Sequence, residues 1–178
     1  MKRIIFTLTN DLNYDQRMNK ICTSLANNEF DVTLVGFKKK SSVPLSQKIF
    51  KQKRLPLFFE RGFFFFAETN IRLFLFLLFQ KCDIICADDL DTALPVLFSS
   101  RIKNKTRVFD AHELFCEMHD IVTRPRIQKF WKSIEKFAQP KFPIGYTANN
   151  DYANEYKKMY GVHYSVIMNC PLLTNETI

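Results

Sequence analysis

One histidine of this 178-residue chain lies among acidic residues that could do chemistry. His112 follows the short β-rich segment Thr106–Phe109 and is flanked by Asp110 and Glu113. A histidine beside carboxylates can hold a proton near neutrality, hydrogen-bond a ligand hydroxyl or ligate a metal. The alternative is a loop histidine whose ring caps a neighbouring backbone group. Its position directly after an expected strand favours function, because open parallel sheets bind ligands at the carboxyl ends of their strands.

Other polar residues follow expected strands in the same way. They are Asn10, Asp11 and Tyr14 after the first strand, Asp88, Asp89 and Asp91 after a central strand, and Asn149 near the end of the chain. Clusters at the same edge of one sheet predict a binding site there. Asp91 precedes an expected helix and is interpreted as its N-cap, so Asp89 is the better candidate for binding.

Two further features bear on this edge. The acidic run could bind Mg²⁺ or hydroxyl groups. We nevertheless expect no metal site, because the chain has only three histidines and His119 lies a helical turn or two beyond His112. Arg17 is expected in the first turn of a helix, where a cation opposes the helix dipole. A bound anion would offset that cost, and so would a partner such as Asp15 or Asp110.

The elements that would position these residues alternate along the chain. Arg3–Thr9 and Asp31–Gly36 are expected strands, and a helix capped by Asp15 lies between them. A helix between two strands so close in sequence is a βαβ unit with parallel strands. The remaining segments repeat the alternation: helix Phe63–Gln80, strand Asp83–Ala87, helix Thr92–Ile102, strand Thr106–Phe109, helix Arg126–Ala138, strand Pro143–Thr147, helix Asp151–Tyr160 and strand Tyr164–Ile167. The sequence therefore predicts an α/β, Rossmann-like, doubly wound parallel sheet with helices on both faces.

A basic stretch interrupts this alternation. Phe37–Arg54 contains six lysines and an arginine without any acidic residue, and it is interpreted as a loop. The Phe-rich segment Leu57–Phe66 follows it. Together they fit a surface that rests on anionic lipid, with contacts from Lys38, Lys39, Lys40, Phe58 and Phe59. The alternative is a solvated loop followed by a core helix, and for Leu73–Phe79 we favour burial in the core.

Composition and missing motifs exclude several classes. The formal charge is +8, and hydrophobic residues make up 47% of the chain, as in a globular protein. The stretch Val162–Asn175 contains no Asp, Glu, Lys or Arg but is too short to span a membrane, and no secretory signal fits the N-terminus. No GxGxxG, P-loop or nucleophile elbow is present, and no nucleic-acid recognition motif accompanies the basic stretch. The five cysteines form no CxxC pair and are interpreted as reduced thiols.

Four segments together resemble the N-terminal lobe of a retaining, family-4-like (group 1) glycosyltransferase of the two-lobed GT-B architecture. They are TNDLNYDQRM (Thr9–Met18), ADDLDTALP (Ala87–Pro95), RVFDAHELFCE (Arg107–Glu117) and VIMNCP (Val166–Pro171). The resemblance implies a domain over residues 1–172, the start of an inter-lobe linker over residues 173–178, and a C-terminal donor-binding lobe that this chain lacks. Where many members have a Gly-Gly pair, this chain has Asn10-Asp11.

The resemblance also implies a function. The full-length protein would move a sugar from a nucleotide-sugar donor to a glycan or lipid-linked acceptor in cell-surface polysaccharide synthesis, and this chain alone would be inactive. His112 would contact the donor sugar, Asp110 or Glu113 would fix its tautomer, and the substrate-binding residues would be Asn10, Asp11, Tyr14, Arg17, Asp89 and Asn149. We expect no cofactor, no nucleic-acid partner and a cytoplasmic location, peripheral at the inner face of the membrane. The alternative is a non-catalytic α/β binding or regulatory domain that docks on an anionic membrane.

Overall fold

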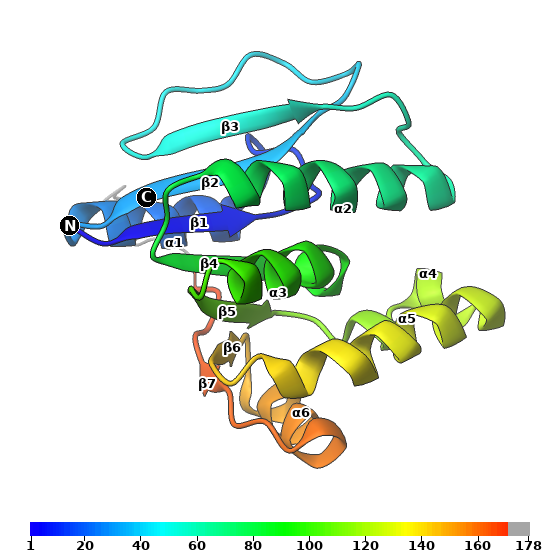
Figure 1. Ribbon diagram of the computed structural model, residues 1–178. Coiled ribbons are helices and arrows are strands. Elements are labelled where there is room, and N and C mark those ends of the chain that lie inside the picture. The colour runs from blue at the N-terminus through cyan, green and yellow to red at the C-terminus, as the bar shows by residue number, and fades with distance from the viewer. Residues whose placement is uncertain (171–178) are drawn as a thin grey trace, which may run out of the picture.

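Seven parallel strands form one sheet in the computed structural model, which describes residues 1–170. The strand order is β3-β2-β1-β4-β5-β6-β7 (Figure 1). The strands are β1 (Arg3–Thr7), β2 (Asp31–Lys38), β3 (Lys51–Pro56), β4 (Ile84–Asp88), β5 (Thr106–Ala111), β6 (Gly145–Thr147) and β7 (Ser165–Val166). The order reverses direction between β1 and β4, which is the topological switch point of a doubly wound sheet. The predicted fold class is confirmed.

The helices begin and end at local sequence signals. They are α1 (Gln16–Asn27), α2 (Gly62–Phe79), α3 (Ala93–Ile102), α4 (His119–Val122), α5 (Pro125–Ala138) and α6 (Asn150–Tyr160), with 3₁₀ turns at Leu90–Thr92, Phe115–Glu117 and Gln139–Lys141. Asp15 caps α1 as predicted, since its carboxylate accepts a hydrogen bond of 2.8 Å from the Met18 N–H. Gly161 ends α6 with φ +69°, a conformation that glycine adopts without strain.

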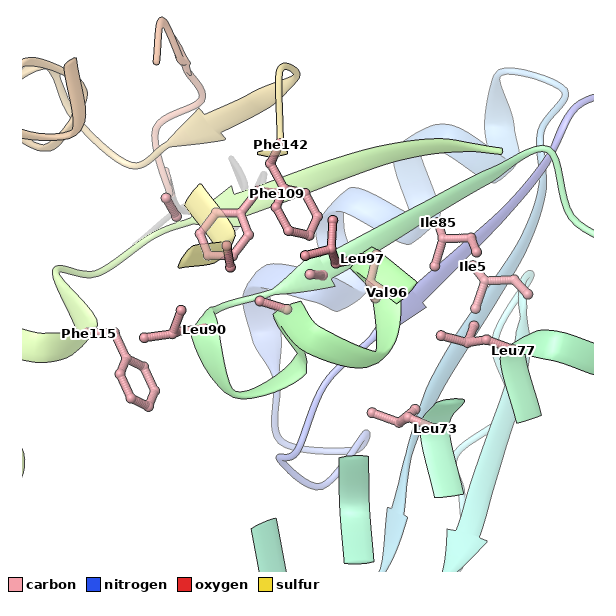
Figure 2. Packing of buried hydrophobic residues seen from close by; sticks show 14 of the residues in the cluster. Ile5, Leu73, Leu77, Ile85, Leu90, Val96, Leu97, Phe109, Phe115 and Phe142 are labelled. Atoms are coloured by element: carbon pink, nitrogen blue, oxygen red, sulfur yellow. The ribbon is translucent and has the colours of Figure 1, made fainter. Parts of the chain in front are cut away.

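Two apolar clusters cover the two faces of the sheet. Ile5 and Ile85 point to the face covered by α2, α3 and α5, where Leu73 and Leu77 of α2 pack on them (Figure 2). Their strand neighbours, such as Ile4 on β1, point to the opposite face and pack with Met18 of α1. Side chains of a strand alternate between faces, so both faces of this sheet are buried. Figure 1 shows α1 behind the sheet and α2, α3 and α5 in front of it.

The basic stretch is not entirely a loop, and this part of the prediction was wrong. Its last residues form β3, which is an edge strand of the described sheet and pairs there with β2. The strand was not predicted because Lys51–Pro56 has no run of apolar residues. Leu55 is the residue of β3 that is buried in the core. Charged side chains such as Lys51 lie along the exposed edge, where they oppose pairing with another chain. The ion pair between Lys51 and Asp31, at 2.7 Å, attaches the edge strand to β2.

Helix α2 contradicts the expectation that no segment could span a membrane. Its 18 residues have a mean hydropathy of 1.6, which is long and apolar enough to cross one by length and composition. This helix was not recognised from the sequence because any charged residue was taken to end a possible membrane span. The two charged residues of the helix, Glu68 and Arg72, lie one helical turn apart and form an ion pair of 2.7 Å. In the fold, α2 packs Phe65, Leu73 and Leu77 into the core, whereas Leu75 and Phe79, in the segment predicted to be buried, are exposed.

Two predictions concern the cysteines and the end of the chain. Cys22, Cys82, Cys86 and Cys116 are free, as predicted, and buried, whereas Cys170 is free and exposed. The expected inter-lobe linker, residues 173–178, lies outside the described residues.

Candidate functional site

Two neighbouring strands end in buried aspartates at the carboxyl edge of the sheet. Asp88 ends β4 and Asp110 lies in β5, and the two are register partners on adjacent strands. Sequence analysis ended the second strand at Phe109, whereas β5 continues to Ala111 and thus includes Asp110. Both carboxylates are almost fully buried, with residue exposures of 4% and 0%. Like charges directly opposite each other in a sheet are unfavourable, so this pair requires cationic partners.

His112 is the first of these partners. Its Nδ1 lies 3.4 Å from Oδ1 of Asp88 and 3.8 Å from Oδ1 of Asp110, and its Nε2 lies 3.3 Å from Oδ2 of Asp89. The imidazole therefore lies between the residues that follow β4 and those that end β5. Glu113 was predicted as an orienting residue, but no side-chain contact places it on the ring, and Asp88 and Asp89 are the closest carboxylates.

Arg17 is the second cationic partner. Its Nη2 donates to Oδ1 of Asp110 at 2.9 Å and its Nε donates to Oδ2 at 3.2 Å, which makes a buried bidentate ion pair. The guanidinium also lies 5.6 Å from the ring centroid of Tyr146. Of the two explanations offered for a cation in the first turn of α1, the partner Asp110 is the one observed. The pair joins residues 93 positions apart.

A third contact crosses the switch point of the sheet. The hydroxyl of Thr9, after β1, donates to Oδ2 of Asp91, after β4. Asp91 was predicted to cap the following helix, but it lies inside the 3₁₀ turn and its carboxylate binds Thr9 instead. Asp89, which begins that turn, has φ +63° and ψ 179°, a backbone conformation that is strained for any residue other than glycine. Strained backbone of this kind is concentrated at functional sites.

Burial sets the protonation of the cluster. Burial raises the pKa of all four aspartates of the cluster, because a buried carboxylate loses its hydration: to about 7 for Asp88 and about 6 for Asp91, and in the same direction for Asp89 and Asp110. Burial alone would lower the pKa of His112, but the hydrogen bond and charge of Asp88 and the charges of Asp89 and Asp110 outweigh it and raise that pKa to about 10. At neutral pH His112 is therefore an imidazolium, with two N–H donors and no capacity to act as a base.

The free energy of unfolding is expected to fall as the pH rises from about 6 to 10. The folded state holds the His112 proton up to a pKa of about 10, compared with 6.5 for an ordinary histidine, so its stabilising contribution is complete below about pH 6.5 and lost as the pH approaches 10. Asp88 acts in the same direction, because its pKa is raised from 3.8 to about 7. Urea unfolding between about pH 6 and 10 should show a slope of up to about 1.4 kcal/mol per pH unit.

The His112→Gln variant is the control for this prediction. All ionisable groups other than His112 are common to both proteins. The difference between wild type and variant should therefore shrink steadily toward pH 10. A difference that does not change with pH would show that His112 does not carry a raised pKa.

The structure places the other predicted binding residues less centrally. Asn10 and Tyr14 are exposed in the loop after β1, which ends beside β4 at the same edge of the sheet. Asp11 lies in the same loop, but its carboxylate accepts hydrogen bonds from Ser42 and Arg54 and holds the basic stretch in place. Asn149 caps α6 by accepting a hydrogen bond of 2.8 Å from the Tyr152 N–H.

Sequence reasoning missed two members of the site. Asp88 was placed in the cluster but not selected, although it is the closest carboxylate to His112 Nδ1. Tyr146 was not considered, although it is the register partner of Asp110 on β6 and its hydroxyl is buried. An available signal was position, since both residues lie where a predicted strand ends.

Asp88, Asp110 and His112 are also the residues that could hold a metal ion. One ligand atom from each lies within 4.8 Å of the others. The guanidinium of Arg17 already binds both oxygens of Asp110, and its positive charge opposes a cation at this point. The absence of a metal cofactor stays a prediction.

The residues predicted to contact a membrane lie near one another, between the end of β2 and the start of α2. Lys38 ends β2, and the ammonium of Lys39 lies 5.6 Å from the ring centroid of Phe65 at the start of α2. The Lys40 N–H donates to Glu60 at 2.6 Å. Phe58 and Phe59, just before α2, are 81% and 50% exposed. The structure thus brings the basic and aromatic residues together, and contact with a membrane stays a prediction.

The fold and this edge define a Rossmann-like lobe of the kind found in two-lobed GT-B proteins, and solved structures agree. The chain is similar to a UGT transferase from Siraitia grosvenorii in complex with UDP, with a TM-score of 0.62, 6% identity and coverage of 100% of this chain and 53% of that one. It is also similar to UGT2 of Phytolacca americana complexed with UDP-2fluoro-glucose and pterostilbene, with a TM-score of 0.64, 6% identity and coverage of 99% and 55%.

A third similar structure is a putative UDP-N-acetylglucosamine 2-epimerase from Listeria monocytogenes, with a TM-score of 0.61, 10% identity and coverage of 89% and 42%. No protein-family model and no curated protein matches the sequence. At these identities the likeness shows the fold alone. The chain spans about half the length of these proteins.

Proposed function

We propose that this chain is the N-terminal, acceptor-side lobe of a retaining, family-4-like glycosyltransferase. The complete protein would transfer a sugar from a nucleotide-sugar donor to a glycan or lipid-linked acceptor, in polysaccharide synthesis at the cytoplasmic face of a membrane. Similar solved structures contain UDP or UDP-2fluoro-glucose, which supports a uridine nucleotide as the donor carrier. The half-length coverage supports a second lobe that binds that donor.

One observation carries this proposal. Within residues 1–170, Nδ1 of His112 and the Oδ1 atoms of Asp88 and Asp89 are buried and make no hydrogen bond of good geometry, although Nδ1 and the Asp88 Oδ1 face each other at 3.4 Å as an ion pair. Unpaired buried polar atoms are costly and rare, so their concentration around one imidazole requires a reason. Sugar hydroxyls both donate and accept hydrogen bonds, and they would satisfy an imidazolium N–H and two carboxylate oxygens together.

The charges of the site fit the chemistry of sugar transfer. The reaction develops positive charge at the anomeric carbon and negative charge on the leaving diphosphate. In their ionised form, the carboxylates of Asp88 and Asp89 favour the first, and the His112 imidazolium can donate to a donor-sugar hydroxyl and favour the second. Arg17 holds Asp110 in place and so keeps the acidic wall of the site rigid. A second lobe would exclude water from this edge, so the chain alone is expected to be inactive.

A purely non-catalytic adaptor or regulatory domain explains less of the structure. Membrane contact through Phe58, Phe59 and the neighbouring lysines would account for the exposed aromatic residues. It would leave the unpaired polar atoms around His112 and the strained backbone of Asp89 without a purpose. The glycosyltransferase proposal accounts for both, and it is compatible with membrane contact.

The test is donor use by the protein with both lobes. We expect one member of a panel of nucleotide-sugars to be turned over, measured as release of the nucleoside diphosphate, and the 178-residue chain to release none. If no nucleotide-sugar binds or reacts with the two-lobed protein in the presence of membrane extract as the acceptor source, the proposal is wrong.

A further inference from the structure

A long apolar groove lies between α2 and the α4–α5 segment, beside the candidate site. Its volume is about 730 Å³, within the range of small-molecule sites. The wall residues include Phe66, Leu90, Phe115, Ile121, Trp131 and Ile134. Trp131 forms the centre of an aromatic cluster, with its ring centroid 5.2 Å from that of Phe66 and 4.9 Å from that of Phe115. The interior of the groove is therefore suited to hydrocarbon.

One part of the groove adjoins the polar cluster. Leu90 lines the groove and stands between Asp89 and Asp91 in the 3₁₀ turn. Asn70, another lining residue, donates a hydrogen bond of 3.0 Å to the Asp91 carbonyl. The groove thus lies beside the 3₁₀ turn that follows β4, although its lining includes neither Asp89 nor His112.

Another part of the rim is basic. Arg124 and Arg126 line the groove where α5 begins, both are exposed, and neither has a salt bridge within residues 1–170. Within residues 1–170, Asp120 is the one acidic side chain of the lining, so this part of the rim keeps a net positive charge. Phe63 and Phe130, also in the lining, are 69% and 49% exposed. An apolar interior with an unpaired cationic rim matches an amphiphile that has an anionic head.

We infer that the groove binds the hydrocarbon chain of a membrane-borne lipid phosphate. The phosphate would pair with Arg124 and Arg126, and the chain would lie against Phe66 and Trp131. Each buried methylene is expected to strengthen binding by about fourfold. The inference goes beyond the proposed function, because it concerns a lipid held beside the site and assigns no acceptor. The exposed phenylalanines before α2 would then contact the membrane from which the lipid enters.

Trp131 is the only tryptophan of the chain, so its fluorescence reports on the groove directly. The experiment titrates the chain with dodecyl phosphate, with a dibrominated long-chain alkyl phosphate, with dodecanol and with inorganic phosphate, each alkyl compound below its micelle concentration. We expect saturable quenching of Trp131 by the brominated chain, because bromine quenches indole on contact. Dodecyl phosphate should compete for it, dodecanol should compete more weakly, and inorganic phosphate should not compete.

Variants on one helix separate the groove from the surface. Ala67→Phe adds a ring inside the groove, whereas Leu75→Phe adds carbons at an exposed position of α2 outside it. We expect the first change to weaken dodecyl phosphate at least tenfold and the second to leave it unchanged. Ile127→Glu, on the exposed rim, provides a second blocking variant that does not disturb the core. Replacing both rim arginines with serine should weaken the phosphate but not the alcohol.

Several results would overturn the inference. They are absence of saturable quenching, equal weakening by Ala67→Phe and Leu75→Phe, equal affinity of wild type for the alcohol and the phosphate, or a concentration-dependent dimer that the Ala67→Phe change abolishes. The measurement needs no nucleotide-sugar. Its failure therefore leaves the transfer proposal standing, and failure of transfer with intact chain binding would remove the proposed function instead.

Discussion

Replacing His112 with alanine is expected to lower sugar transfer by the two-lobed protein about 10²–10³-fold. The imidazolium lies within 3.4 Å of Asp88 and 3.3 Å of Asp89, so the change removes a preorganised positive charge from an acidic site. It also leaves those carboxylates without their cation. The loss should fall mainly on kcat, because charge on the leaving diphosphate develops in the transition state. Initial rates of nucleoside diphosphate release measure it.

The matched control is His163→Ala, which removes an exposed histidine from the same domain. This variant should keep the wild-type rate. A His112→Gln variant should recover part of the activity, because an amide still donates a hydrogen bond but carries no charge. If His112→Ala transfers sugar at the wild-type rate, the central role assigned to this residue is wrong.

Replacing Arg17 with methionine is expected to destabilise the fold by about 3–5 kcal/mol. Asp110 is fully buried, and Arg17 makes two hydrogen bonds to it. Without the guanidinium, the carboxylate must either remain charged without its main partner or take up a proton. Methionine keeps the apolar contacts of the arginine stem, so the loss reports on the ion pair rather than on packing. Urea denaturation at neutral pH measures the change in the free energy of unfolding.

Two comparisons give this prediction a scale. Lys51→Met breaks the exposed pair with Asp31 and should cost no more than about 1 kcal/mol. The double variant Arg17→Met, Asp110→Asn should be more stable than Arg17→Met alone, because the uncompensated charge has been removed. Equal losses for Arg17→Met and Lys51→Met would show that the buried pair does not matter for stability.

The amino-acid sequence determined the order of most elements and most of their limits, although it did not predict β3. The strand Ile84–Asp88 and the helix Pro125–Ala138 lie within one residue of their predicted starts and ends, because each depends on its own periodicity and end signals. The carboxyl edge of the sheet was predictable for the same reason. Once the strands are parallel, the residues that follow them meet at one edge, and His112 was selected on that basis.

The tertiary structure alone decided how those residues act on each other. Arg17 pairs with Asp110, and Thr9 with Asp91, across separations of 93 and 82 residues, which sequence patterns do not encode. The pKa of His112 follows from the burial of its carboxylate neighbours, a property that exists only in the folded chain. The groove beside Trp131 likewise arises between helices that are far apart in sequence. Local sequence specifies local backbone, whereas charge, burial and cavity shape depend on packing between distant segments.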